Sequence, residues 1–234
     1  MPVYELSEEL LFPPLHHAEP DGLLAFGGDL SVERLVLAYR SGLFPWFNEG
    51  DPILWWSPDP RLVLFPEELK ISRSLARRLR SGRFTYSLNR DFEGVIQHCA
   101  QCARPGQEGE TWINDAMIQA YMDLHRAGVA HSVEVYRGEV LVGGLYGIGI
   151  GACFFGESMF ALETDASKCG FATFVPTLQE QGIEMIDCQV NTGHLERFGA
   201  REISREDFIL RLERMCAEDI RLPIVGRPLP LIDK

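Results

Sequence analysis

Glu157, Asp187 and Gln189 are the residues whose types and spacing best suit catalysis. Glu157 lies in the segment CFFGESMF (153–160), among three phenylalanines and a methionine. Asp187 and Gln189 are two residues apart in the segment MIDCQV (185–190), a spacing that places both side chains on one face of a strand. A charge removed from water without a partner costs several kcal/mol, so Glu157 must be neutralised, face a polar cavity or meet a cation. We expect the third solution, a cation that arrives with a ligand.

These residues suit a ligand that carries both an amine and an apolar group. In a regular strand Phe155, Glu157 and Met159 share a face, as do Asp187 and Gln189. If both faces line one cavity, the carboxylates bind the amine and the large apolar side chains bind the rest of the ligand. The alternative is a buried hydrogen-bond network with a solitary edge glutamate, and the residues alone leave both possibilities open.

Other catalytic templates are incomplete. Ser158 lies in the sequence GESMF, which has Phe where a nucleophile elbow needs its last Gly. The glycines at 147, 149 and 151 precede no helix that could bind a phosphate, so we expect them to allow a bulge or close backbone packing. The six histidines show no metal-binding spacing, and Cys99 and Cys102 fall near the end of a helical pattern, as two core thiols would. We therefore expect no metal and no cofactor.

Composition bounds the class of protein. The chain has 234 residues, of which 46% are hydrophobic and 24% charged, and it is long enough to bury a core. Residues 1–11 lack the basic start and apolar run of a signal peptide, and the longest uncharged stretch, 140–156, is too short to span a membrane. Six cysteines in apolar contexts indicate reduced thiols. We expect a cytoplasmic monomer with no membrane partner.

One basic segment stands out against a net charge of −12, which should repel nucleic acid from most of the surface. Residues 70–83, KISRSLARRLRSGR, contain six basic residues and no acid. On a helix, the basic side chains on one side are Lys70, Arg73, Arg77 and Arg80, and the apolar ones on the other are Ile71, Leu75 and Leu79. A solvated face is the commoner explanation of such a stripe, but in an acidic protein it favours contact with phosphates.

The pattern of elements predicts two domains. We expect residues 1–62 to form a small loop-rich domain that Trp46, Trp55 and Trp56 hold together. Its one helix begins after Ser31, the N-cap, and ends before Gly42. In residues 63–234 we expect helices at 90–103 and 114–127, strands at 131–137, 140–148 and 151–160, a helix at 166–181, a strand at 183–190 and a helix at 204–217. This order predicts an α/β (α+β) fold with a mixed sheet flanked by helices, of the general kind used by acyltransferases.

Long motifs of the chain resemble the bacterial leucyl/phenylalanyl-tRNA-protein transferases. They include EPDGLLAFGGDLSVERLVLAYRSGLFPWF, DPILWWSPDPR, LVGGLYG, FFGESMF and IDCQVNTGHLERFGA, in order from about residue 19 to about residue 210. In that family an aminoacyl group moves from the tRNA 3′ end to the α-amine of a protein that begins with Lys or Arg, which marks that protein for degradation. The resemblance implies a small N-terminal domain joined to an acetyltransferase-like domain.

The resemblance also implies roles for matching residues. Glu157 matches the glutamate that holds the amino group of the esterified Leu or Phe, and Trp46 and Trp112 match the tryptophans that contact the terminal adenosine. Stacking on an aromatic face is a sensible way to hold an unpaired base. The pocket for the Leu or Phe side chain maps to Leu145, Phe154, Met159, Phe174 and Ile186, with Leu145 where the family often has Met, a volume-conserving change. The tRNA-backbone contact maps to the basic helix, with Arg73, Arg77, Arg80 and Arg83.

Asp187 and Gln189 match the pair assigned to the acceptor amine. Because the ester is already activated, the reaction needs a neutral amine placed against the carbonyl and stabilisation of the developing oxyanion, not a covalent intermediate. We hypothesise that Gln189 orients the attacking nitrogen and that Asp187 fixes Gln189. Whether Asp187 is a general base or an electrostatic anchor stays open.

Two other functions compete with this interpretation. The strand order alone also favours an acyl-CoA N-acyltransferase, but we find no Gly-rich turn from a strand into a helix that could bind a pyrophosphate. The basic segment and the aromatic residues favour a noncatalytic RNA-binding module, which would leave Glu157, Asp187 and Gln189 without a purpose. An acidic cleft suits an acceptor whose first residue is Lys or Arg.

Overall fold

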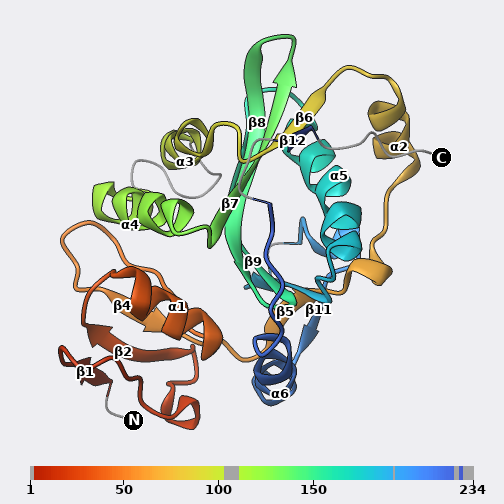
Figure 1. Ribbon diagram of the computed structural model, residues 1–234. Helices are drawn as coiled ribbons and strands as arrows, with labels where there is room; N and C mark the ends of the chain where they lie inside the picture. Colours follow the sequence, from red (N-terminus) through yellow and green to blue (C-terminus); the bar gives the residue numbers. More distant parts are fainter. Residues whose placement is uncertain (1–2, 103–110, 192, 224–226, 229–234) are drawn as a thin grey trace.

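The computed structural model describes residues 3–102, 111–191, 193–223 and 227–228. Within these ranges the chain forms two β-sheets with helices packed against them, which confirms the predicted α/β (α+β) class (Figure 1). The smaller sheet has four strands and comes from the N-terminal part of the chain, and the larger has eight.

The small sheet has the strand order β1-β2-β4-β3. Its strands are β1 (Tyr4–Leu6), β2 (Leu23–Gly27), β3 (Phe44–Pro45) and β4 (Leu54–Trp56), and helix α1 (Val32–Arg40) joins β2 to β3. The helix begins as predicted, because Oγ of Ser31 accepts a hydrogen bond from the N–H of Arg34. It ends before Gly42, whose φ of +78° lies in the region that favours glycine.

The three tryptophans of this part are not equivalent. Trp55 is fully buried and donates from Nε1 to the carbonyl of Gly27. Trp56 packs partly against the core, whereas Trp46 is 43% exposed. The prediction that all three hold the fold together is therefore wrong for Trp46, whose ring is available to a ligand.

The large sheet has the order β11-β5-β10-β9-β8-β7-β6-β12. Its centre follows the prediction: β7 (Ala130–Arg137), β8 (Val140–Ile150) and β9 (Cys153–Ala161) are consecutive antiparallel strands. β10 (Met185–Gln189) pairs parallel to β9, so the sheet is mixed. The remaining strands are short and show no period in the sequence: β5 (Arg61–Leu64), β6 (Thr85–Leu88), β11 (Arg201–Ile203) and β12 (Arg227–Pro228).

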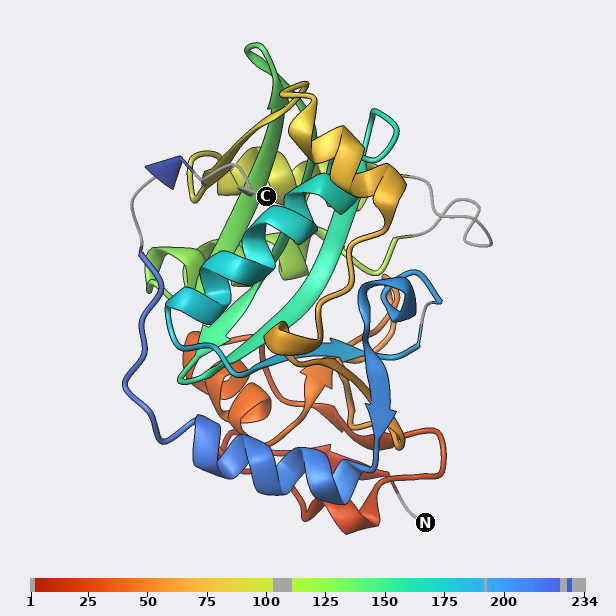
Figure 2. The same ribbon diagram turned by 90° about the vertical axis from the view of Figure 1, so that its right-hand side faces the viewer.

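Helices cover both faces of the large sheet. In Figure 1, α3 (Phe92–Gln101) and α4 (Asp115–Arg126) lie on one face, and α5 (Ala166–Glu180) lies on the other with α2 (Arg73–Arg80) beside it, as Figure 2 also shows. Helix α6 (Arg205–Met215) lies at the lower end of the sheet, near β5. The caps of α4 and α6 are the predicted Asn114 and Ser204, which accept from the N–H groups of Met117 and Asp207. We expected the helix that corresponds to α3 to end at residue 103, which lies outside the described residues.

Two apolar cores lie on opposite faces of the large sheet. The first joins α1, α3, α4 and the small sheet to one face and contains Tyr39, Tyr121 and Phe155. The second lies under α5 and α2 and contains Phe154 and Phe174. The core to which a side chain belongs therefore shows on which face of the large sheet that side chain lies.

A bulge in β9 isolates Glu157 from the regular pairing. Gly156 pairs with Gly147 and Ser158 pairs with Tyr146, so Glu157 is an extra residue between two consecutive pairs. The extra residue reverses the alternation of faces. The expectation that Phe155, Glu157 and Met159 share a face is wrong, because Phe155 belongs to the first core and Met159 packs against the second.

The glycines of β8 and its turn allow close packing, as predicted. A Cβ on Gly147, beside the bulge, would lie 2.2 Å from the carbonyl oxygen of Phe155. A Cβ on Gly151, whose φ is +55°, would lie 2.1 Å from the carbonyl oxygen of Met215. Neither position has room for a side chain.

None of the six cysteines, all of which lie in the described ranges, forms a disulfide, and Cys99 is buried in the first core. The described residues contain no group of His, Cys, Asp and Glu side chains arranged to hold a metal ion. Among the helices of the described ranges, none combines the length and apolar character that a membrane span requires.

Candidate active site

Glu157 accepts three hydrogen bonds from three different elements. Its Oε1 accepts from the hydroxyl of Tyr39 on α1 at 2.8 Å and from Nε2 of Gln189 at the end of β10 at 3.0 Å. Its Oε2 accepts from the hydroxyl of Tyr121 on α4 at 2.8 Å. Glu157 is partly buried, and it takes part in none of the ion pairs that the described residues form. We expected Glu157 to have no Lys or Arg partner within the chain, and no ion pair of the described residues includes it.

The two tyrosines and Glu157 form a ring of oxygens that is short of one proton when Glu157 is ionised. The hydroxyls of Tyr39 and Tyr121 lie 2.5 Å apart, so the ring has three oxygen–oxygen contacts. Burial raises the pKa of both tyrosines well above the usual value, so each phenol keeps its proton. Two phenol protons cannot serve three contacts, whereas a proton on Glu157 completes the ring.

The pKa of Glu157 agrees with this count. Burial raises it from 4.5 to about 7, although the hydrogen bonds from Tyr121 and Tyr39 favour the ion. The charge of Asp187 also opposes ionisation of Glu157, and that of Arg61 favours it. Near neutral pH the residue therefore exchanges between a neutral acid that closes the ring and an anion that needs a further donor.

Asp187 is held by a buried cation. Nε and Nη2 of Arg61 donate to its two carboxylate oxygens at 2.8 and 2.7 Å, and the side chains are 1% and 0% exposed. The guanidinium lies over the rings of Phe44 and Phe208, at 4.8 and 4.7 Å from their centroids. Oδ1 of Asp187 also accepts the backbone N–H of Gln189 at 2.9 Å. Both oxygens of Asp187 are thus occupied by donors.

Gln189 adopts a left-handed backbone conformation, with φ of +62°. The pairing of β10 with β5 shifts register between Asp187 and Gln189, so the two residues are not related by regular strand alternation. The structure nevertheless brings them together, because Asp187 accepts from the Gln189 backbone while the Gln189 side chain donates to Glu157. Asp187, Gln189 and Glu157 form one hydrogen-bonded series.

The five residues expected to form the apolar pocket are also grouped. Leu145 pairs opposite Met159, Ile186 pairs opposite Phe154, and the ring of Phe154 contacts that of Phe174 at 5.1 Å. They belong to the second core or pack against it, and Met159 is the one that is partly exposed. The hydroxyls that hold Glu157 belong to the first core, so the carboxylate and the apolar group lie on opposite faces of the sheet.

The pairing of β9 with β10 ends between these two groups. The parallel pairing of β9 with β10 covers Met185–Asp187 and ends at the pair of Phe155 and Asp187. Glu157 and Gln189 lie beyond this last pair, where a hydrogen bond between their side chains replaces the backbone ladder. Phe154 and Ile186 of the apolar group form the pair directly before the last one, so the end of the ladder adjoins both groups.

One cavity is lined by residues that are close in sequence to Trp46 and Trp112, although neither tryptophan lines it. Trp46 is exposed and its ring contacts that of Trp56 at 5.8 Å, whereas Trp112 is 9% exposed. A cavity of about 360 Å³ is lined by Glu49, three residues after Trp46, and by Thr111 and Ile113, the neighbours of Trp112. The structure thus brings together the two segments that we expect to contact an adenosine.

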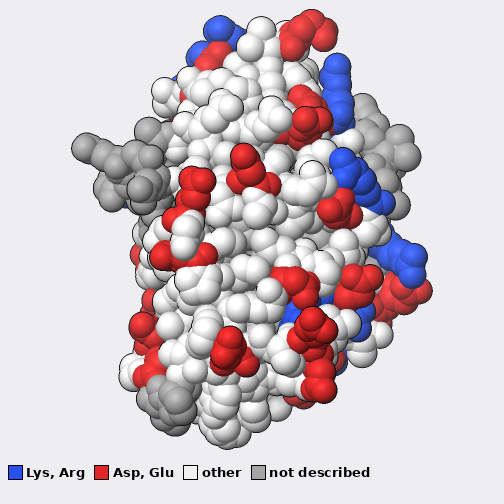
Figure 3. Space-filling view, turned by 90° about the vertical axis from the view of Figure 1, so that its left-hand side faces the viewer, with Lys and Arg blue, Asp and Glu red and all other residues white. Residues whose placement is uncertain are grey.

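The basic helix presents the predicted faces. In α2, Leu75 and Leu79 are buried, while Arg73, Arg77 and Arg80 are exposed. Arg83 is exposed too, but it follows the helix, which ends at Arg80, so its expected place in the helix is wrong. Arg83 donates to Glu163 at 2.6 Å. The expected extent was too long, because Ser72 caps the helix, so that Lys70 and Ile71 precede it. Figure 3 shows acidic side chains spread over the face that α3 and α4 cover, with basic ones fewer there and visible mainly along the right-hand margin and at the top.

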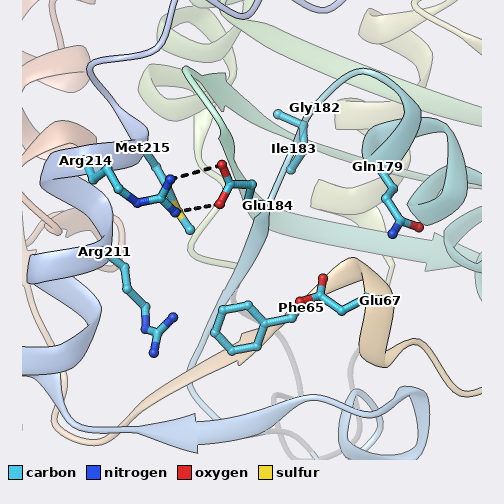
Figure 4. Close-up of a pocket in the computed structure, with 9 residues that line it drawn as sticks. All are labelled: Phe65, Glu67, Gln179, Gly182, Ile183, Glu184, Arg211, Arg214 and Met215. Atoms are coloured by element: carbon cyan, nitrogen blue, oxygen red, sulfur yellow. Dashed lines mark hydrogen bonds and ion pairs between the residues drawn. The ribbon is translucent and has the colours of Figure 1, made fainter.

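A separate cavity of about 260 Å³ lies away from these residues (Figure 4). Its lining includes Phe65, Arg211 and the ion pair in which Arg214 donates to Glu184 at 2.5 and 3.2 Å. Its lining contains neither Glu157, Asp187 nor Gln189, and its charged groups Glu184, Arg211 and Arg214 are already in ion pairs. We therefore place the candidate active site at Glu157 and Gln189, just beyond the last residue pair that joins β9 to β10.

Sequence reasoning missed Tyr39, Tyr121 and Arg61. Arg61 stands directly before the apolar run LVLF, and a buried Asp on another strand requires such a cation, so the two opposite charges were a usable signal. Tyr39 and Tyr121 lie on the buried faces of α1 and α4, where an aromatic residue is ordinary, and nothing in the sequence pairs them with Glu157.

Comparisons with known proteins identify relatives along most of the chain. A family model described as "Leucyl/phenylalanyl-tRNA protein transferase" matches residues 63–213, and one described as its N-terminal domain matches residues 28–59. A protein of Anaeromyxobacter sp. (strain Fw109-5) named leucyl/phenylalanyl-tRNA–protein transferase is 58% identical over 214 residues, 92% of this chain and 91% of its own. Proteins of the same name from Syntrophobacter fumaroxidans and Ectopseudomonas mendocina are 57% and 60% identical, over 93% and 87% of this chain and 93% and 90% of theirs. The solved structure of L-PGS from Bacillus licheniformis is 11% identical with a TM-score of 0.45 over 83% of this chain and 71% of its own, and we draw no conclusion from it.

Proposed function

The chain belongs to the leucyl/phenylalanyl-tRNA protein transferase family, and on this premise we propose that it transfers Leu or Phe from aminoacyl-tRNA to the α-amine of proteins that begin with Lys or Arg. In this proposal the enzyme is a cytoplasmic monomer of two domains, 1–62 and 63–234, uses no cofactor, and its product marks the acceptor protein for degradation. Glu157 carries the proposal, because it has three hydrogen-bond donors and no Lys or Arg partner among the described residues. The α-ammonium of the donor amino acid is the missing cation.

The donor amino acid binds where the pairing of β9 with β10 ends. Its ammonium meets Glu157, and its side chain enters the apolar group of Leu145, Phe154, Met159, Phe174 and Ile186. Support comes from the end of the strand pairing at Phe155 and Asp187, which lies between Glu157 and the apolar pair of Phe154 and Ile186. Met159, the partly exposed member, is the point of entry. A group of Leu, Ile, Met and Phe side chains suits Leu and Phe and offers nothing to a polar side chain.

The tRNA binds through its end and its backbone. The terminal adenosine contacts Trp46, whose ring is exposed, and Trp112, beside the cavity lined by Thr111 and Ile113. The acceptor stem lies along the exposed arginines of α2, which can neutralise phosphates without leaving an acidic partner, since Arg73, Arg77 and Arg80 form no ion pair with the described residues.

The chemistry requires placement more than a reactive side chain. A neutral acceptor amine attacks the ester carbonyl, a C–N bond forms, the bond to the ribose oxygen breaks, and the proton that leaves the amine is balanced by the one that the ribose oxygen gains. Gln189 donates from Nε2 to Glu157, so its amide oxygen is free to accept an N–H of the acceptor amine. Asp187 acts as an electrostatic anchor, because donors already occupy both of its oxygens.

A transfer assay tests the proposal. The protein is incubated with leucyl-tRNA or phenylalanyl-tRNA and a peptide that begins with Arg, and the product is examined by mass. We expect the mass of one Leu or Phe residue to be added, and no addition when the N-terminus of the same peptide is acetylated. Absence of transfer from both donors would overturn the proposal. An acyl-CoA thioester serves as the control donor, and transfer from it would favour the acyl-CoA acyltransferase alternative.

A further inference from the structure

Arg61 is a buried charge to which the proposed reaction assigns no role. Its side chain is 1% exposed and makes a two-point contact with Asp187, with no direct contact to Glu157 or to the side chain of Gln189. Its third nitrogen, Nη1, is buried and has no hydrogen-bond partner among the described residues. A buried donor without a partner is rare and requires an explanation.

Stability does not explain this arrangement. A buried ion pair recovers in mutual attraction little more than its two ions lose by leaving water, and apolar residues of similar volume are often as stable or more so. The unpaired Nη1 adds a further cost. The planar guanidinium, however, lies over the rings of Phe44 and Phe208, which restrict its orientation, and its fork fixes the plane of the carboxylate that it binds.

The fixed carboxylate holds a backbone conformation that the chain would otherwise avoid. Gln189 has φ of +62°, which is uncommon for a residue other than Gly. The N–H of Gln189 donates to Oδ1 of Asp187, the same oxygen that accepts from Nε of Arg61. The conformation of Gln189 then directs its side chain to Glu157, at 3.0 Å. The contacts therefore run without a break from Arg61 to the carboxylate of Glu157.

We propose that Arg61 is a positioning residue for aminoacyl transfer: its two-point contact orients Asp187, which holds the Gln189 backbone so that the Gln189 amide faces Glu157 and the acceptor amine. This inference rests on the proposed function for its catalytic consequence but not for its structural one. The orientation of Gln189 depends on Arg61 whatever reaction the site performs.

The test compares Arg61→Lys with a matched control, Arg34→Lys. Lysine keeps the charge but cannot make the two-point contact. Arg34 is also fully buried and bound to a carboxylate, that of Asp29, but it lies in the N-terminal part and touches none of the site residues. We expect Arg61→Lys to lower kcat about 100-fold while leaving KM for leucyl-tRNA within about twofold, because the attacking amine is misplaced while donor binding is intact. Arg34→Lys should leave kcat near that of the wild type.

Hydrogen exchange of the Gln189 backbone N–H gives a readout independent of activity. In Arg61→Lys this amide should exchange at least about tenfold faster, a change that corresponds to one lost hydrogen bond, while it stays protected in Arg34→Lys. If Arg61→Lys does not fold, Phe44→Leu loosens the guanidinium without altering any charge, and smaller changes of kcat and exchange in the same directions are expected.

The outcomes separate the two proposals. Wild-type kcat and unchanged exchange at Gln189 in a folded Arg61→Lys variant would overturn the positioning role, as would a loss of activity equal to that of Arg34→Lys. If the wild type transfers neither Leu nor Phe, the proposed function fails, and the exchange at Gln189 still decides whether Arg61 positions it.

Discussion

Glu157 is held in a state that favours ligand binding over stability. Three donors converge on its carboxylate, yet burial raises its pKa to about 7, and no Lys or Arg of the described chain forms an ion pair with it. An ammonium that enters the site supplies both a counter-charge and N–H donors for the oxygens. The affinity for the donor amino acid should therefore be greatest above the pKa of Glu157.

Glu157→Gln should stabilise the protein above neutral pH. The pKa of Glu157 rises from 4.5 when unfolded to about 7 when folded, so its contribution to stability is complete below pH 4.5 and is lost as the pH rises through about 7. The neutral amide of Gln avoids this loss. At pH 8 the free energy of unfolding of the variant should therefore exceed that of the wild type by up to about 3 kcal/mol. Urea unfolding at pH 4.5 and pH 8 measures the difference. A gap that does not widen with pH would contradict the raised pKa, and the same variant should lose transfer activity.

Asp187→Asn distinguishes an anchor from a base. The amide oxygen can still accept the N–H of Gln189, but the contact with Arg61 loses its charge. We expect kcat to fall about 10- to 100-fold while the shape of its pH dependence stays that of the wild type, because Asp187 does not take the proton of the amine. The pH profile of kcat for both proteins is the measurement. Loss of a pH-dependent limb in the variant would restore Asp187 as the general base.

At the scale of elements, the arginines of α2 serve the proposed contact with tRNA and are not needed for the fold. The apolar side of the helix, with Leu75 and Leu79, packs inward and its arginines face solvent, so their substitution should leave the fold intact. The double substitution Arg73→Ala and Arg77→Ala should weaken the binding of tRNA. It should also reduce the slope of the logarithm of the binding constant against the logarithm of the salt concentration by about 1 to 2, according to how many contacts to phosphates are lost. Binding titrations at several salt concentrations test this. Arg126→Ala on α4 is the matched control, an exposed arginine paired with Asp123, and an equal effect there would show that only net charge matters.

The sequence predicted elements that have a period and missed those that do not. The caps at Ser31, Asn114 and Ser204 and the alternation in residues 130–161 identified the long helices and the central strands. Strands of two to four residues, such as β5 and β11, are fixed by their neighbours in the sheet and leave no local signal. Glu157, Asp187 and Gln189 could be selected because polar residues in apolar runs are conspicuous. The tyrosines could not, because their contacts to Glu157 span 118 and 36 residues of sequence.

At the scale of the whole molecule, the N-terminal part completes the site of the large sheet. Tyr39, on α1, donates to Glu157, and Phe44, on β3, flanks Arg61. The larger part expressed without residues 1–60 would lack both contacts. The two parts are therefore one functional unit, although each has its own sheet.

Tyr39→Phe tests this dependence in the intact chain. Removing a donor that favours the ionised form should raise the pKa of Glu157 further. The acidic limb of the pH dependence of kcat/KM for leucyl-tRNA should then move to higher pH, while activity well above that limb is largely kept. Tyr136→Phe, a buried tyrosine that does not contact Glu157, is the control. An unmoved acidic limb would mean that Tyr39 does not govern the ionisation of Glu157.

The bulge in β9 separates what the fold needs from what the site needs. Gly156 and Ser158 already pair with the adjacent residues Gly147 and Tyr146, so a strand with position 157 deleted could form an unbroken ladder with Phe155, Met159 and Phe160 on the faces that they occupy now. Glu157 is thus the one residue of β9 that the ladder with β8 can spare. A deletion there would give a more regular sheet and an empty site.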